Sequence, residues 1–275
     1  MEAAVVSVAT LRGLWQRSLI AWPDGLRDTT TSVYWLQGPS FYADLRQPAG
    51  RPDLSGIRCL DDLDREGLMW LAGQEGFAGE LTFDGTCFEW ARALDFQPKS
   101  PYSDCGFLHF EGDVLVERGR DVAYVEHWHR GPEATLPSCA VRLTEAGGRR
   151  AAFLVRAGDQ FMFARDRATP LPEADSLADI VKAAPDMAHA RDLLDCELSF
   201  GHVGDDGWLI TRSSLPYREG MGLAPVTGHG GALLLTADVA RDGTPISREW
   251  QIEALQGVLT DLVDFSALRP TALAR

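Results

Sequence analysis

Short apolar runs alternate with turn residues along most of the chain, and this pattern limits the folds open to it. The runs are rich in Val, Leu, Trp, Tyr and Phe, as in Ser32–Gln37, Phe41–Arg46 and Val122–His129. Clusters such as Asp84-Gly85 separate them and favour tight turns, because Gly and Asp adopt the backbone angles that such turns need. Many short strands joined in this way predict antiparallel barrels or sandwiches and disfavour a parallel α/β sheet.

The runs form two sets that meet near Gly131-Pro132. The 275 residues are enough for two small domains. The turn spacing predicts about eight strands in each half, so we expect a mainly β protein of two consecutive antiparallel β-barrels, at residues 1–131 and 132–275.

One or two short helices interrupt the expected strands. Apolar residues of Ser176–Leu194 share one helical face, and Ser176 is a suitable N-cap. Pro185 lies inside this pattern and should kink or split the helix. Leu60–Gln74 is a second helical candidate.

Composition excludes several classes of partner. Forty acidic residues against 26 basic ones give a net charge of −14, which repels phosphate backbones and anionic lipid, so we expect neither a nucleic-acid nor a membrane partner. No apolar run approaches the roughly 20 residues of a membrane helix. The five cysteines are widely spaced, without a C-x-x-C pair, which indicates reduced thiols and a cytoplasmic location.

Several motifs resemble those of calycins, the superfamily that includes the lipocalins. Gly13-Leu14-Trp15 is similar to the G-x-W signature of the first calycin strand. Further segments resemble a little-characterised yeast and bacterial branch with two successive barrels: Trp90-Ala91-Arg92, Asp104-Cys105-Gly106, Glu126-His127-Trp128 and Gly158-Asp159-Gln160-Phe161. The resemblance implies barrels that hold small apolar or amphipathic ligands, and it brings no catalytic residues.

The same resemblance implies a defined environment for Trp15. Its indole closes one end of the barrel, its N–H meets a backbone carbonyl, and an arginine from another strand stacks over the ring. We expect that arginine to be Arg130.

Three strands of the first half each place aromatic side chains beside an arginine or a carboxylate, because alternate residues of a strand share a face. Together these faces predict a semi-polar pocket inside the first barrel, lined by Tyr42, Arg46, Trp90, Arg92, Tyr124, Glu126 and Trp128. A solvated outer face and a buried structural ion pair are the alternatives. Second-half strands such as Gln160–Arg165 carry aromatics and arginine without a carboxylate, so we place the site in the first barrel.

The pocket suits a cytoplasmic binding protein for a small amphipathic or acidic ligand, without a cofactor. The alternative is a cofactor-free isomerase, cyclase or hydratase, with Glu126 as acid or base and Arg46 or Arg92 stabilising negative charge. A bidentate bond to an arginine would make Glu126 structural, whereas an apolar cavity against Trp90 or Trp128 would raise its pKa and favour catalysis. A protein-binding module that uses an outer barrel face is a third possibility.

A metal site is the weakest hypothesis. His127 and His129 share one strand face and could chelate zinc, with His109 or Glu117 as a third ligand if the fold brings one near. Because no complete ligand set is visible, we expect no metal. Neither G-x-S-x-G nor H-E-x-x-H occurs in the chain.

Overall fold

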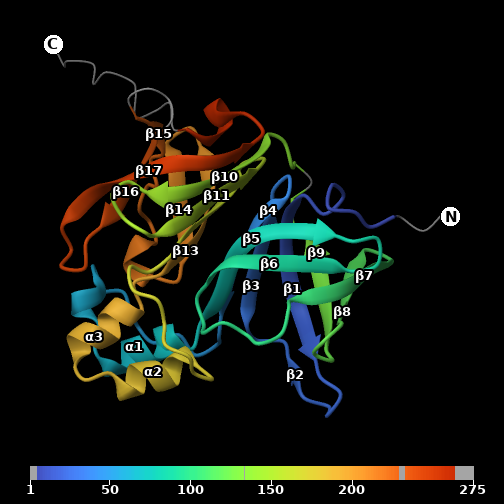
Figure 1. Cartoon of the computed structure of the whole chain (residues 1–275), viewed down its shortest axis with the longest axis horizontal. Helices are drawn as coiled ribbons and strands as arrows, with labels where there is room; N and C mark the ends of the chain where they lie inside the picture. Colours follow the sequence, from blue (N-terminus) through green and yellow to red (C-terminus); the bar gives the residue numbers. More distant parts are fainter. Residues whose placement is uncertain (1–4, 133, 229–232, 264–275) are drawn as a thin grey trace.

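Strands dominate the computed structural model, which describes residues 5–132, 134–228 and 233–263. The first sheet contains β1 (Gly13–Ala21), β2 (Arg27–Asp28), β3 (Ser32–Gln37), β4 (Phe41–Gln47), β5 (Glu75–Phe83), β6 (Phe88–Asp95), β7 (Cys105–Glu111), β8 (Val114–Gly119) and β9 (Val125–Arg130). Each strand pairs antiparallel with its neighbours, and β1 also pairs with β9 from Trp15↔Arg130 to Ala21↔Val125. These pairings close β1 and β3–β9 into a barrel, with β2 added beside β1 (Figure 1).

The second sheet is antiparallel but open. Its strands are β10 (Ser138–Glu145), β11 (Ala151–Ala157), β12 (Gln160–Arg165), β13 (Glu197–Gly204), β14 (Gly207–Ser213), β15 (Val226–Thr227), β16 (Leu233–Val239) and β17 (Pro245–Gln256). The outermost strands, β14 and β15, do not pair in the part of the chain that the structure describes. The mainly β class of two consecutive antiparallel sheets is therefore confirmed, with a half-barrel in place of the second closed barrel.

Two helical segments follow the sequence expectation. The first comprises η1 (Leu60–Asp62) and α1 (Arg65–Ala72), between β4 and β5. The second is α2 (Leu177–Ala183) and α3 (Met187–Leu193), which Pro185 separates because it lacks the N–H that a continuous helix needs. The Ser176 hydroxyl caps α2 by accepting from the Asp179 N–H at 3.1 Å. None of the described helices is long and apolar enough to cross a membrane.

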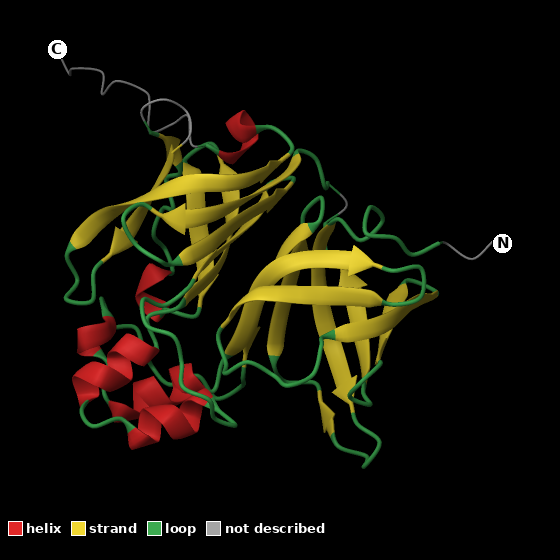
Figure 2. Cartoon of the chain, viewed as in Figure 1, coloured by secondary structure: helices red, strands yellow, loops and turns green. Residues whose placement is uncertain are grey.

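The helices of the two halves pack together beside the second sheet (Figure 2). Short one-turn helices η2 (Pro216–Arg218) and η3 (Leu259–Leu262) complete the fold.

Strand β4 is buried on both faces, and this joins the two halves. Phe41, Ala43 and Leu45 belong to a core that also contains second-half residues, and Phe41 meets Phe153 edge-on at 5.5 Å between ring centroids. Tyr42, from the other face, lies in the core of the first barrel. The division into domains 1–131 and 132–275 stays a prediction, because this shared core spans it.

Candidate functional site

Four tryptophans fill the interior of the first barrel. Trp35 meets Trp90 and Trp128 edge-on, each at 5.5 Å between ring centroids, and stacks on Trp15 at 6.0 Å. Trp90 and Trp128 are 4% and 2% exposed and therefore point inward. Trp35 was not predicted from the sequence. It lies two residues after Val33 in β3, so the two side chains share a strand face, and both are buried.

Trp15 has the environment that the calycin resemblance implies. Its Nε1 donates to the Leu11 carbonyl at 2.7 Å. The guanidinium carbon of Arg130 lies 4.3 Å from the ring centroid, so the predicted stacking partner is confirmed. Arg130 is held there because its Nη1 donates to the carbonyl of Arg12 at 2.8 Å.

Glu126 is ion-paired. Its Oε1 lies 2.5 Å from Arg17 Nη1 and 3.7 Å from Arg46 Nη1. Arg46 in turn donates from Nε to Asp44 Oδ1 at 2.9 Å. The pairing uses one oxygen and is not bidentate, but Glu126 lies beside arginines and not in the apolar cavity expected of a catalytic carboxyl, which favours a structural role.

Tyr124 and Trp128 meet a different carboxylate, Glu117. The Tyr124 hydroxyl donates to Glu117 Oε1 at 2.7 Å, and Trp128 Nε1 donates to Oε2 at 3.1 Å. Burial, reinforced by the nearby charge of Glu126, raises the pKa of Glu117 well above its usual value. From the sequence, Glu117 was a candidate only for a third metal ligand, and its contacts with Tyr124 and Trp128 were not predicted.

The barrel interior contains more acid than base. Asp44, Glu117 and Glu126 face Arg17 and Arg46. Burial raises the pKa of Asp44 to about 6, although the charge of Arg46 opposes the shift. The pocket that Asp44, Arg46 and Glu117 line together with aromatic rings holds about 10 Å³, which is too small for an organic ligand.

A much larger cleft lies on the outer side of β6. Its volume is about 580 Å³, and its walls are β6 and the loop that leads to β7, namely Glu89–Ala93, Asp95 and Lys99–Asp104. The cleft exists because β6 pairs with β7 at only two positions, Phe88↔Gly106 and Glu89↔Cys105. Trp90 and Asp104 line both this cleft and the small interior pocket, so they form the wall between the two.

Arg92 also lies in this wall, next to a β-bulge in β6. Strict alternation in β6 would place Leu94 on the same face as Arg92, but the register shifts between Gly79↔Arg92 and Ala78↔Leu94. Leu94 therefore enters the core shared with the second half. Gly79 permits the bulge, since a Cβ there would lie 1.9 Å from the Ala91 carbonyl oxygen.

The Arg92 guanidinium stacks on Phe77, 3.6 Å from the ring centroid, and pairs with Asp104 at 2.7 Å and Asp95 at 3.1 Å. Behind it, the Tyr42 hydroxyl is fully buried and has no hydrogen-bond partner among the described residues. Burial and the charge of Asp104 raise the pKa of Tyr42 well above its usual value.

The seven predicted residues are thus divided among three environments. Arg46 and Glu126 join the Arg17 ion pairs, and Tyr124 and Trp128 meet Glu117. Trp90, Arg92 and the hydroxyl of Tyr42 lie at the cleft wall or behind it.

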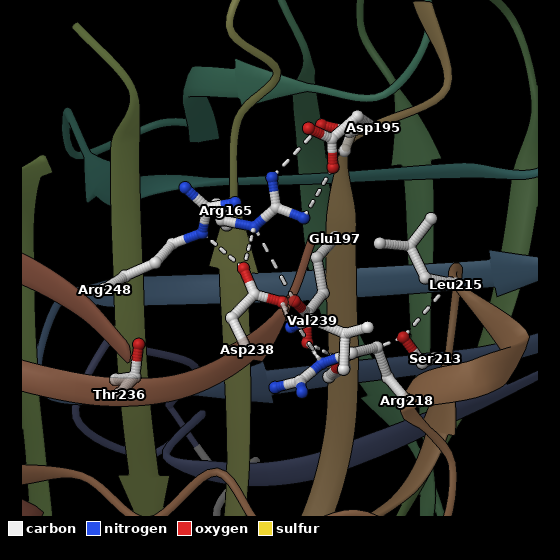
Figure 3. Close-up of polar contacts among 12 residues, drawn as sticks. Arg165, Asp195, Glu197, Ser213, Leu215, Arg218, Thr236, Asp238, Val239 and Arg248 are labelled. Atoms are coloured by element: carbon white, nitrogen blue, oxygen red, sulfur yellow. Dashed lines mark hydrogen bonds and ion pairs between the residues drawn. The ribbon is translucent and has the colours of Figure 1, made fainter. Parts of the chain in front are cut away.

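A second ionic cluster lies buried in the half-barrel (Figure 3). Arg165 on β12 pairs with Asp195 at 2.8 Å and Asp238 at 3.4 Å, and Arg218 pairs with Glu197 at 3.0 Å. Arg248 pairs with the same Asp238. The strand Gln160–Arg165 carries no carboxylate of its own, and the carboxylates that pair with Arg165 come from other segments of the second half.

Two of the histidines considered for a metal site make other polar contacts. His129 Nε2 lies 2.8 Å from the hydroxyl of Ser18, and His109 Nε2 lies 3.0 Å from Glu111 Oε1. Within the described ranges, no three His, Cys, Asp or Glu side chains gather in a group that could hold a metal.

Comparison with known proteins gives one structural similarity. No family model matches the chain, and neither does any curated protein sequence. The crystal structure of the uncharacterized protein YLR301w from Saccharomyces cerevisiae is similar, with a TM-score of 0.49 and 10% identity over 89% of this chain and 98% of that chain.

Proposed function

We propose that the chain binds a small amphipathic molecule in the cleft between β6 and the loop 96–104. The observation that carries the proposal is the cleft itself, whose volume of about 580 Å³ is within the range of ligand pockets, roughly 300–1,000 Å³. Trp90, Ala91, Pro101 and Tyr102 provide apolar surface in its walls, and Arg92, Asp95 and Asp104 provide polar groups.

The cleft replaces the barrel interior as the proposed binding position. Aromatic rings and ion pairs fill the interior, whereas Trp90 and Arg92, both selected from the sequence, line the cleft. The Trp15 and Arg130 geometry supports calycin-like ancestry, which we retain as part of the proposal.

Location is also part of the proposal. All five cysteines are unpaired and buried, which supports a reducing compartment such as the cytoplasm. The net charge of −14 supports a small-molecule partner over nucleic acid or a membrane surface.

Native mass spectrometry of the protein purified from its own cells tests the binding proposal. We expect a retained small molecule in the natural chain and its loss in Ala91→Trp, because Ala91 is exposed on the cleft wall and an indole would occupy the space. Ala188→Trp, at an exposed position of α3 in the other half, is the matched control. A chain that carries no small molecule, or one whose bound molecule is unaffected by Ala91→Trp, would contradict the proposal.

A further inference from the structure

We infer that the cleft prefers a ligand whose head group is a positively charged amine over one whose head group is a carboxylate. This inference rests on the proposed function and specifies the ligand class for the same site. It reverses the acidic ligand that arginines in the sequence suggest.

Arg92 is the only arginine among the described residues that line the cleft. Each nitrogen of its guanidinium already donates to a carboxylate: Nε and Nη2 to Asp104, and Nη1 to Asp95. A carboxylate ligand at Arg92 would lie beside the charges of Asp104 and Asp95, which already pair with this arginine. The oxygens of Asp95 and Asp104 can accept further hydrogen bonds from an ammonium.

The side chains that line the cleft carry more negative than positive charge. Glu89, Asp95 and Asp104 line it together with only Arg92 and Lys99. Behind the wall, the interior has the same imbalance, with Asp44, Glu117 and Glu126 facing Arg17 and Arg46. An ammonium head reduces the excess negative charge, whereas a carboxylate increases it.

Two probes with the same body and opposite heads test the inference. Tryptamine and indole-3-propionate share an indole that can cover Pro101 and Tyr102, and they differ in carrying an ammonium or a carboxylate. Titrations followed by NMR of the full chain should show shifts within residues 89–104, with tryptamine bound at least tenfold more tightly. Asp104→Asn should weaken tryptamine at least tenfold and strengthen indole-3-propionate, because it frees Arg92.

Asp206→Asn, on an exposed turn of the half-barrel, is the matched control and should leave both affinities unchanged. Ala91→Trp should abolish binding of both probes and covers the case in which Asp104→Asn does not fold. Equal or tighter binding of indole-3-propionate at the cleft would overturn the inference and leave the binding proposal intact. Failure of both probes to shift residues 89–104 would overturn the inference, while the retained molecule in mass spectrometry would still decide the binding proposal.

Discussion

The protein buries two ionic clusters, and they differ in charge balance. In the half-barrel, the arginines Arg165, Arg218 and Arg248 face an equal number of carboxylates, those of Asp195, Glu197 and Asp238. In the first barrel, the acids exceed the arginines. Burial by itself raises the pKa of a carboxyl in both places.

The balance decides the direction of the final shift. Against the effect of burial, the three arginines around Asp238 hold its pKa below the usual value. Asp44, beside one arginine and near Glu126, has its pKa raised to about 6. The carboxyls of the half-barrel cluster therefore remain ionised. The cluster in the first barrel has more carboxyl groups than arginines to pair with them, and it lies next to a cleft.

We expect the largest effect from a substitution that breaks the balanced cluster of the half-barrel. Arg218→Ala should lower the free energy of unfolding by about 3–5 kcal/mol, because Glu197 and Asp238 would remain buried with too little positive charge. Urea unfolding measures the loss. Arg58→Ala removes an exposed pair with Asp62 and should cost well under about 1 kcal/mol. Equal losses of unfolding free energy in the two variants would contradict the prediction that the buried cluster stabilises the fold more than an exposed ion pair does.

The next effect is the pH dependence of stability. The folded pKa of Asp44, about 6, exceeds the usual 3.8, so the folded state binds a proton that the unfolded state has released between these values. Stability should therefore fall as pH rises from about 4 to about 6.5, by about 3 kcal/mol from this group. Asp238, whose pKa is lowered, should lose its contribution only below about pH 4. Urea unfolding at a series of pH values tests the sign, and stability that rises over the same interval contradicts it.

A smaller effect comes from Glu117. Glu117→Gln should raise stability at pH 7 by about 1–2 kcal/mol and flatten the pH dependence, because the amide needs no proton from solvent to remain neutral when buried. The side-chain oxygen can accept from Trp128 Nε1, and the amide nitrogen can donate to the Tyr124 hydroxyl. Unfolding at two pH values measures both effects, and an unchanged slope argues against a raised pKa for Glu117.

The smallest effect concerns Tyr42. Tyr42→Phe should stabilise the protein by about 1 kcal/mol, because it removes a buried hydroxyl without a partner. Tyr124→Phe is the matched control and should destabilise by about 1 kcal/mol, since it removes the hydrogen bond to Glu117. Thermal unfolding compares the two, and destabilisation by Tyr42→Phe would show that its hydroxyl has a partner in solution.

Local patterns in the sequence were sufficient for most of the fold. The runs Ser32–Gln37 and Gln160–Arg165 coincide with strands, and Pro185 marks the break between two helices. These features depend on neighbours in the chain. The open half-barrel depends on how the outer strands meet, which alternation does not encode.

The candidate site was less accessible to sequence analysis. Alternation placed Trp90 and Trp128 on an aromatic face, and both lie in the barrel core. It could not locate the bulge in β6, because Gly79 on the neighbouring strand permits it. It also could not pair Arg165 with Asp238, which lies far along the chain and meets Arg165 only through the three-dimensional arrangement of the sheet.

Because β4 is buried on both faces, its two faces become covered at different times during synthesis of the chain. All pairings that close the first barrel lie within residues 13–130, so that barrel can form while the ribosome is still translating the half-barrel. Until the strands carrying Phe153 and Leu198 emerge, Phe41 and Leu45 on the outer face of β4 lack the second-half residues of their core. The nascent first half therefore passes through a stage with more apolar surface exposed on β4 than in the complete protein.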